Sequence, residues 1–186
     1  MKSILGVVLA GGKSTRMGQD KAQLLRHNET MLSFTERALK SVGIEQVVVS
    51  GERHGIADTY PNLGPLSGVY SVLSQYQPDA MLIVPVDLPL IDHDTLKGLL
   101  NFGLSTEKAC SYHQHSLPLF LPNSGYLNLW LTQRLKQSSV RGPSFKELFN
   151  AVPSQQFKAP NEKALSNCNT VEQWQRACRE LEFNYE

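Results

Sequence analysis

The sequence predicts a three-layer α/β sandwich whose central sheet is mainly parallel. Short apolar runs at residues 4–9, 46–50 and 80–85 are typical of strands that are buried on both faces. Segments with helical spacing of apolar residues separate these runs, and strands that alternate with helices at this pitch usually form a parallel sheet covered by helices. Since 186 residues suit one domain with a substantial core, we expect residues 1–186 to form a single domain.

Each expected element has a local signal. Glycine-rich polar stretches mark loops, Gly43 provides a helix stop, and Asp92 or Asp94 provides a helix cap. In chain order we expect a strand at 4–9, a loop at 10–22, a helix at about 30–42, a strand at 46–50, a helix at about 67–75, a strand at 80–85 and a helix ending at about 102. Less regular strands at 108–112 and 117–121, helices at about 124–137 and 143–150, and a final helix capped by Thr170-x-x-Gln173 follow.

The composition excludes several functional classes. A formal net charge of +1 argues against binding of nucleic acid through overall electrostatic attraction. The apolar start is too short to span a bilayer and leads into a glycine-rich loop instead of a cleavage site. The cysteines, Cys110, Cys168 and Cys178, contain no CxxC pair and fit a reducing compartment. We therefore expect a cytoplasmic protein with neither a membrane nor a nucleic-acid partner.

The loop after the first strand has the composition of a phosphate-binding loop. Its glycines let the backbone approach a phosphate, its successive N–H groups can form an anion-binding concavity, and its cations can neutralise the charge. These residues are Gly11, Gly12, Gly18, Lys13, Arg16 and Lys21. Ligands of an open parallel sheet bind beyond the carboxyl ends of its strands, where this loop begins. The alternative is a glycine-rich surface turn with solvated charges.

Two common nucleotide-binding motifs are excluded by spacing. Gly12-Lys13-Ser14 resembles the end of a Walker A loop, but that motif requires glycine at position 7, where this chain has valine. A G-x-G-x-x-G dinucleotide fingerprint is also missing from the sequence. The loop is therefore neither a P-loop nor a dinucleotide-binding turn.

The string L-A-G-G-K-S-T-R-M-G-x-D-K resembles the signature loop of the molybdenum cofactor guanylyltransferases, within the wider nucleotidyltransferase superfamily. The G-G-x-x-x-R part is shared by many sugar-phosphate nucleotidyltransferases, whereas the M-G-x-D-K ending is narrower. Gly11 favours the guanine-using branch, because the related cytidylyltransferase usually has L-A-A-G. The resemblance implies a Rossmann-like, GT-A-like nucleotidyltransferase fold.

Three further segments are similar to elements of that family. Residues 62–68 (NLGPLSG) resemble G-P-L-A-G, residues 84–89 (VPVDLP) resemble P-C-D-x-P, and residues 167–172 (NCNTVE) resemble N-x-N-T-x-E-E. On physical grounds Gly64 shapes a tight turn into a helix, and Gly68 allows close approach in its first turn, where free N–H groups suit nucleotide oxygens. A simple turn and cap is the alternative for this segment.

Asp87 is the predicted metal ligand. A carboxylate at the end of a central strand can hold Mg²⁺, a hard cation that prefers oxygen ligands. Asn167 and Asn169 alternate, so in extended backbone both side chains face the same way, and the family precedent places them by the metal and the pterin. The alternatives are a turn or capping role for Asp87 and local capping ahead of the last helix for the two asparagines.

The resemblance implies transfer of GMP from GTP to the phosphate of molybdenum-bound molybdopterin, with release of pyrophosphate and with Mg²⁺ as cofactor. The implied partners are GTP and a molybdopterin-type acceptor, with contacts to a molybdoenzyme or its chaperone in addition. The implied catalytic residues are Arg16, Lys21 and Asp87, and Asp87 also holds the metal. The implied nucleotide-binding residues are Leu9, Ala10, Gly11, Gly12, Lys21, Asp58, Gly64 and Gly68. Asn167 and Asn169 are implied to bind the acceptor.

The chain departs from the family pattern in three places. Glu52 replaces the asparagine of S-x-N-R, the loop around Asp58 matches loosely, and residues 113–118 only partly follow H-P-L-F-A. We interpret His113 and His115 as a substrate-facing strand end or as solvated histidines in preference to a metal site. Two other functions stay open: a sugar-1-phosphate nucleotidyltransferase, which shares the loop and the aspartate, and a GTP-binding protein that has lost catalysis.

Overall fold

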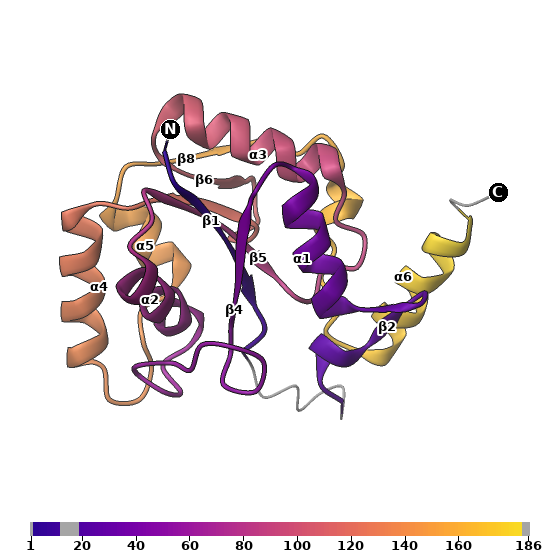
Figure 1. Cartoon of the computed structure of the whole chain (residues 1–186), viewed down its shortest axis with the longest axis horizontal. Helices are drawn as coiled ribbons and strands as arrows, with labels where there is room; N and C mark the ends of the chain where they lie inside the picture. Colours follow the sequence, from indigo (N-terminus) through magenta and orange to yellow (C-terminus); the bar gives the residue numbers. More distant parts are fainter. Residues whose placement is uncertain (1, 12–18, 184–186) are drawn as a thin grey trace.

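Six strands of the computed structural model form one central sheet, in the order β4-β1-β5-β7-β6-β8 (Figure 1). The structure describes residues 2–11 and 19–183. The strands are β1 (Ile4–Leu9), β4 (Gln46–Ser50), β5 (Ala80–Pro85), β6 (Ala109–Tyr112), β7 (Leu119–Pro122) and β8 (Ser154–Phe157). β7 runs antiparallel to β5 and β6, while the other neighbouring pairs are parallel. The predicted α/β sandwich with a mainly parallel sheet is confirmed.

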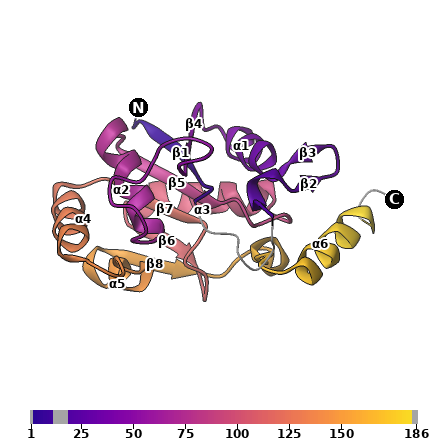
Figure 2. The ribbon, with the colours of Figure 1, turned by 90° about the horizontal axis from the view of Figure 1, so that it is seen from below.

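Helices cover both faces of this sheet. They are α1 (Met31–Ser41), α2 (Pro65–Tyr76), α3 (His93–Thr106), α4 (Gly125–Gln137), α5 (Phe145–Ala151) and α6 (Val171–Phe183), with short 3₁₀ helices η1 (Lys21–Gln23) and η2 (Glu162–Leu165). α1 and α3 pack on one face, and α2, α4 and α5 pack on the other. A ribbon of β2 (Leu25–Arg26) and β3 (Glu29–Thr30) lies on the same side of the molecule as α6 (Figures 1 and 2).

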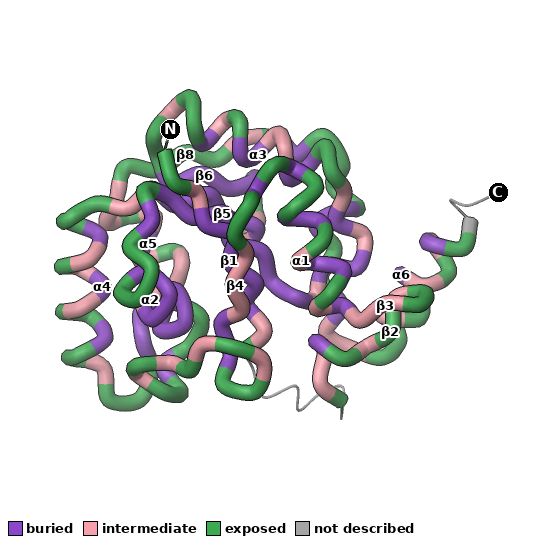
Figure 3. Tube along the Cα trace, viewed as in Figure 1, coloured by how far each residue is buried: buried purple, intermediate pink, exposed green. Residues whose placement is uncertain are grey.

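Two apolar cores result from the alternation of side chains along the central strands. Val8 and Leu82 point into the core under α1 and α3, whereas Val7 and Ile83 point into the core under α2 and α4. All four side chains are fully buried, and Figure 3 shows the central strands as the buried part of the fold. The apolar runs of the sequence are therefore strands that are buried on both faces, and this packing fixes the positions of their carboxyl ends.

Most predicted boundaries are confirmed because the capping signals are local. β1, β4 and β5 begin and end at the predicted residues, and Thr30 and Asp92 cap α1 and α3. Thr170 and Gln173 exchange hydrogen bonds at the start of α6, as the capping-box pattern predicts. α3 continues past the predicted end near 102, since the chain carries no strong stop there until Glu107 adopts a left-handed conformation (φ 55°).

The β2–β3 ribbon and β8 are not predicted by any pattern in the sequence. Each ribbon strand has two residues, too few to show a period of two. β8 has the polar sequence SQQF and pairs with β6 at the edge of the sheet, so three of its four residues are exposed and no apolar alternation marks it. Among residues 2–11 and 19–183, no helix combines the length and apolar character needed to cross a bilayer.

Candidate active site

The carboxyl ends of three parallel strands meet at one edge of the sheet. β1 lies between β4 and β5, and all three run in the same direction. Backbone hydrogen bonds extend the pairing beyond the strands, from Ala10 N to Ser50 O (2.9 Å) and from Val86 N to Leu9 O (3.1 Å). The loops that follow the strands are therefore held side by side, in the position where parallel sheets bind ligands.

Four polar side chains from distant parts of the chain meet at this edge; we call them the Lys21–Asp87 cluster. Lys21 Nζ lies 3.0 Å from Asp87 Oδ2 and 2.5 Å from Asn169 Oδ1. Asn167 Nδ2 donates to Asp87 Oδ1 at 3.0 Å. The Lys21 and Asp87 side chains are only 17% and 16% exposed, so their ion pair is partly shielded from water. The structure thus brings together four residues that the sequence analysis assigns to the site.

Lys21 is positioned by the short helix that it begins. Asp20 caps η1, accepting a hydrogen bond from Ala22 N at 3.0 Å, and Ala22 is fully buried. The other Asp20 oxygen lies 2.7 Å from His54 Nε2, on the loop after β4. Burial raises the pKa of Asp20, but hydrogen bonds with His54 and the Ala22 amide outweigh burial and hold that pKa below its usual value. A charged Asp20 therefore links the Lys21 segment to the neighbouring loop.

Asn167 and Asn169 are positioned by the residue between them. Cys168 is 4% exposed, and its backbone N–H donates to Asp87 O at 2.9 Å. The asparagines flank this anchor, so both side chains reach the Lys21–Asp87 cluster, as their alternation predicts. Capping of α6 is provided by Thr170 with the side chain of Gln173, so the asparagine side chains are not needed for it.

The environment of Cys168 makes it an inert thiol. Burial, reinforced by the negative charge of Asp87, raises the pKa of Cys168 to about 11. At pH 8 we expect alkylation of Cys168 by iodoacetamide to be on the order of 10²-fold slower in the folded protein than in denaturant, because the thiolate is the reactive form. The rate should climb as the pH approaches 11. Peptide mass spectrometry measures it, and equal rates in the two states would contradict the assigned burial.

The loop after β4 and the first turn of α2 approach each other closely. Gly64, with φ of 88°, precedes Pro65 at the start of α2, which confirms the predicted tight turn. A Cβ at Gly68 would lie 2.2 Å from Ser50 Oγ and 3.2 Å from Asp58 Oδ1, so the absence of a side chain lets these two residues approach the first turn of α2. These contacts place Asp58 beside the carboxyl end of β4.

Asp58 has the environment of a ligand-binding carboxylate. It is half-buried, and no hydrogen-bond donor within residues 2–11 and 19–183 reaches its side chain. Burial and the nearby negative charge of Glu52 raise the pKa of Asp58. A desolvated carboxylate of this kind gains stability when a ligand supplies N–H donors.

Gly68→Ala is expected to destabilise the fold by about 1–3 kcal/mol, because the new methyl group must displace Ser50 or Asp58. Gly125→Ala is the matched control: Gly125 also lies in the first turn of a helix, and nothing lies within 4 Å of the added Cβ. Urea unfolding followed by circular dichroism measures both variants. Equal midpoints for the two would show that the Gly68 site can relax without cost.

Two predicted site residues, Gly12 and Arg16, lie outside the described residues, as do Lys13 and Gly18. Leu9 is buried at the end of β1, whereas Gly11 is exposed at the same edge. A Cβ at Gly51 would lie 2.9 Å from Gly11 N, so the first loop starts directly against the loop after β4.

The His113–His115 pair does not form a metal centre with other described residues. His113 is exposed, and His115 Nε2 lies 3.6 Å from Glu162. Across residues 2–11 and 19–183, no three His, Cys, Asp or Glu side chains are arranged to hold a metal ion. The Asp20–His54 contact could not be predicted from the sequence, because no local pattern indicates an interaction across 34 positions.

Comparisons with known proteins identify the family of the chain. Residues 6–139 match the MobA-like NTP transferase domain. A molybdenum cofactor guanylyltransferase from Xanthomonas euvesicatoria pv. vesicatoria is 36% identical over 181 residues, covering 94% of each chain. One from Campylobacter jejuni subsp. doylei is 27% identical over 188 residues, covering 94% of this chain and 95% of the other.

Structural comparison extends the likeness to the whole fold. The crystal structure of molybdopterin-guanine dinucleotide biosynthesis protein A from Archaeoglobus fulgidus superposes with a TM-score of 0.76, at 16% identity, over 96% of this chain and 98% of the other. The domain match spans well over half of the sequence and includes Lys21 and Asp87. The chain therefore belongs to the MobA-like NTP transferase family and is a nucleotidyltransferase.

Proposed function

We propose that this chain transfers GMP from GTP to the terminal phosphate of molybdenum-bound molybdopterin, forming the guanine dinucleotide and pyrophosphate. The observation that carries the proposal is the Lys21–Asp87 cluster at the carboxyl edge of the sheet. It joins a cation, a carboxylate able to hold a metal and two amides at the edge of the sheet where β1 ends. A relative named for this reaction, aligned over 94% of the chain, supports the choice of substrates.

The reaction requires alignment and charge stabilisation more than a covalent catalyst. A phosphate oxygen of the acceptor attacks the α-phosphorus of GTP, and the bond between that phosphorus and the pyrophosphate oxygen breaks. In our proposal the backbone N–H groups of Gly11 and Gly12 bind the β- and γ-phosphates, and Arg16 neutralises the departing pyrophosphate. Lys21 approaches the α-phosphate, where charge builds as the new bond forms.

Lys21 must exchange partners for this role. Its ammonium group is held by Asp87 and Asn169 in the structure. A lysine side chain has a flexible four-carbon stem, so a modest rotation can redirect the ammonium while the η1 backbone stays in place. This rotation releases Asn169, while Asn167 is bonded to Asp87 and not to Lys21. Both asparagines are proposed to contact the acceptor.

Mg²⁺ is the proposed cofactor, and the chemistry of the donor set fits it. Asp87, Asn167 and Asn169 all carry side-chain oxygens, the ligands that this hard cation prefers. The ammonium of Lys21 already lies between oxygens of Asp87 and Asn169, so this position attracts a cation. Mg²⁺ commonly takes one or two carboxylates and completes its shell with phosphate oxygens and water, which suits a site centred on Asp87. When bound, it neutralises charge on the triphosphate.

The loop after β4 is proposed to bind the nucleoside. Leu9 and Ala10 lie at the carboxyl end of β1, and Asp58 lies beside Gly68 in the first turn of α2. The half-buried Asp58 carboxylate suits the N–H donors of a guanosine. Glu52 lies nearby and can also accept from guanine N–H groups in place of the family's asparagine amide.

The decisive experiment is pyrophosphate release with GTP, CTP or ATP, in the presence of Mg²⁺ and molybdenum-loaded molybdopterin. Release selectively with GTP is expected. Selective release with CTP would overturn the base assignment, and release with a hexose 1-phosphate as acceptor would indicate a sugar nucleotidyltransferase. Nucleotide binding without release from any pairing would indicate a non-catalytic protein. Removal of Mg²⁺ with EDTA should abolish release, and restoring Mg²⁺ should recover it.

The proposed location of the reaction is the cytoplasm. Cys110, Cys168 and Cys178 are free thiols. Such thiols persist in a reducing compartment, whereas secreted proteins tend to oxidise them. Fractionation of cells with an antibody to the chain tests this location, and recovery in the periplasm would contradict it.

A further inference from the structure

The β2–β3 ribbon connects the Lys21 segment to α1. Leu24 N bonds to Lys21 O (3.3 Å), and Met31 N bonds to Leu24 O (2.8 Å), so the ribbon folds back between η1 and the start of α1. Within the ribbon, Arg26 pairs with Glu29 across the antiparallel ladder. Any side chain that fixes the ribbon therefore also fixes Lys21, which lies a few residues before it.

Arg26 makes two contacts that tie the ribbon to other elements. Its Nε donates to Pro89 O at 2.8 Å, and its guanidinium carbon lies 3.8 Å from the centre of the Phe34 ring on α1. Phe34 is 5% exposed and Pro89 is buried, so the guanidinium is partly shielded from water between them. A planar guanidinium can stack on a ring and donate at its edge at the same time, which an ammonium group cannot do.

Pro89 belongs to the segment that carries Asp87. Between them, Leu88 is fully buried, and its carbonyl accepts a hydrogen bond from Ile91 N at 3.3 Å, which makes a tight turn. The Asp87 carbonyl accepts from Cys168 N, so the same turn also supports the two asparagines. A contact that fixes the position of Pro89 therefore also fixes the position of Asp87.

We infer that Arg26 is a positioning residue that keeps the Lys21 and Asp87 segments at a fixed separation. The polar contacts between the two segments include the Lys21–Asp87 ion pair and the Arg26–Pro89 hydrogen bond. The ion pair must open when Lys21 turns to the α-phosphate, a step that rests on the proposed function. Arg26 then holds the segments together and preserves the position of the carboxylate for the metal.

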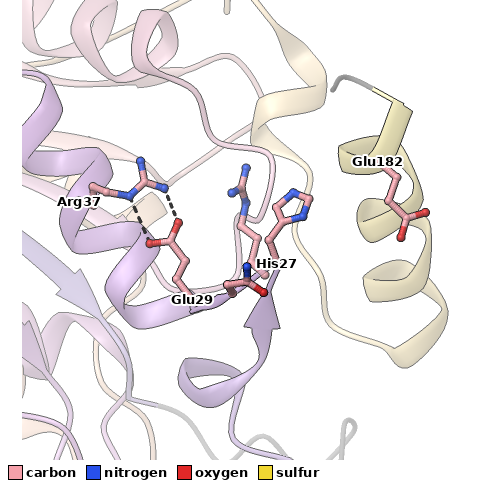
Figure 4. Close-up of a pocket in the computed structure, with 6 residues that line it drawn as sticks. His27, Glu29, Arg37 and Glu182 are labelled. Atoms are coloured by element: carbon pink, nitrogen blue, oxygen red, sulfur yellow. Dashed lines mark hydrogen bonds and ion pairs between the residues drawn. The ribbon is translucent and has the colours of Figure 1, made fainter. Parts of the chain in front are cut away.

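A second arginine on the same surface provides the matched control. Arg37 lies on α1 with its guanidinium carbon 5.5 Å from the centre of the same Phe34 ring, and it forms an ion pair with Glu29 (Figure 4). Both arginines line a cavity of about 570 Å³ between the ribbon and α6, with Glu182 on its α6 side (Figure 4). The Arg37 guanidinium donates hydrogen bonds to Glu29 on the ribbon, on a different element from the segment that carries Asp87. Arg37→Met therefore removes a guanidinium from the same cavity and leaves the Arg26–Pro89 bond in place.

The test compares Arg26→Met, Arg26→Lys and Arg37→Met with the unchanged chain. Amide hydrogen exchange measured by NMR reports the Cys168 N–H, whose partner is Asp87 O. In Arg26→Met we expect this amide to exchange about tenfold faster. We also expect turnover to fall about tenfold and the half-saturating Mg²⁺ concentration to rise about tenfold, while the KM for GTP stays nearly constant. The effects of Arg26→Lys should be intermediate between those of Arg26→Met and the unchanged chain, because lysine keeps a positive charge and a hydrogen-bond donor. Arg37→Met should match the unchanged chain within about twofold.

The outcomes separate this inference from the proposed function. Cys168 exchange that is equal in Arg26→Met and Arg37→Met would overturn the positioning role. If Arg26→Met does not fold, Arg26→Lys decides in its place, and unchanged exchange and unchanged Mg²⁺ dependence in that variant would overturn the role. Accelerated exchange in a chain that never releases pyrophosphate would refute the proposed reaction and support the structural link.

Discussion

Asp87→Ala is expected to fold normally and to lose about 10²–10³-fold in the turnover of GTP. The substitution removes the only carboxylate of the Lys21–Asp87 cluster, and with it the proposed ligand of Mg²⁺. It also leaves Lys21 and Asn167 each without one hydrogen-bond partner, so the electrostatic environment of the phosphates changes. Pyrophosphate release at saturating GTP measures the loss, and circular dichroism with thermal unfolding checks the fold.

Two further variants separate the metal role from local packing. Asp87→Asn keeps the shape and one acceptor oxygen but removes the charge, so it should lose nearly as much activity while unfolding at a similar temperature. Asp94→Ala serves as the control, since its carboxylate lies on the first turn of α3 and is 90% exposed. Its activity should be unchanged. A folded Asp87→Ala protein that retains near-normal turnover at low Mg²⁺ would remove Asp87 from the mechanism.

The elements that carry the site could be predicted because their signals are local. An uninterrupted apolar run determines both ends of β1 and β5, and Asp87 follows such a run directly. The turn at Gly64 and the cap at Thr170 are also encoded within a few residues. Periodicity and capping chemistry alone therefore located the carboxyl edge of the sheet.

The arrangement of the site could not be derived from local signals. Lys21 and Asn169 are 148 positions apart, and their contact depends on how the chain returns across the sheet after β8. The family resemblance placed both residues in one site, but it gave no sign that Lys21 bonds directly to Asp87 and Asn169. Arg26 carried no signal at all, because its ribbon strand is two residues long and its partner is a backbone carbonyl.

Lys21→Ala is expected to lose about 10²–10³-fold in both kcat and kcat/KM, with little change in KM for GTP. Equal losses in the two constants are the signature of a contact made only in the transition state, which is the role proposed for this ammonium. The buried Ala22 and the Asp20 cap hold η1 independently of the Lys21 side chain, so the fold should persist. Lys146→Ala, an exposed lysine on α5, should behave as the unchanged chain.

The double variant Lys21→Ala/Asp87→Ala gives the sharpest test of whether the two residues act as one unit. Groups that act as a unit on one transition state lose activity non-additively, so the double variant should be little worse than the poorer single variant. Losses that multiply would mean that Lys21 and Asp87 contribute to turnover independently once their 3.0 Å ion pair has opened. A rise in KM for GTP with constant kcat in Lys21→Ala would instead assign Lys21 to ground-state binding of the triphosphate.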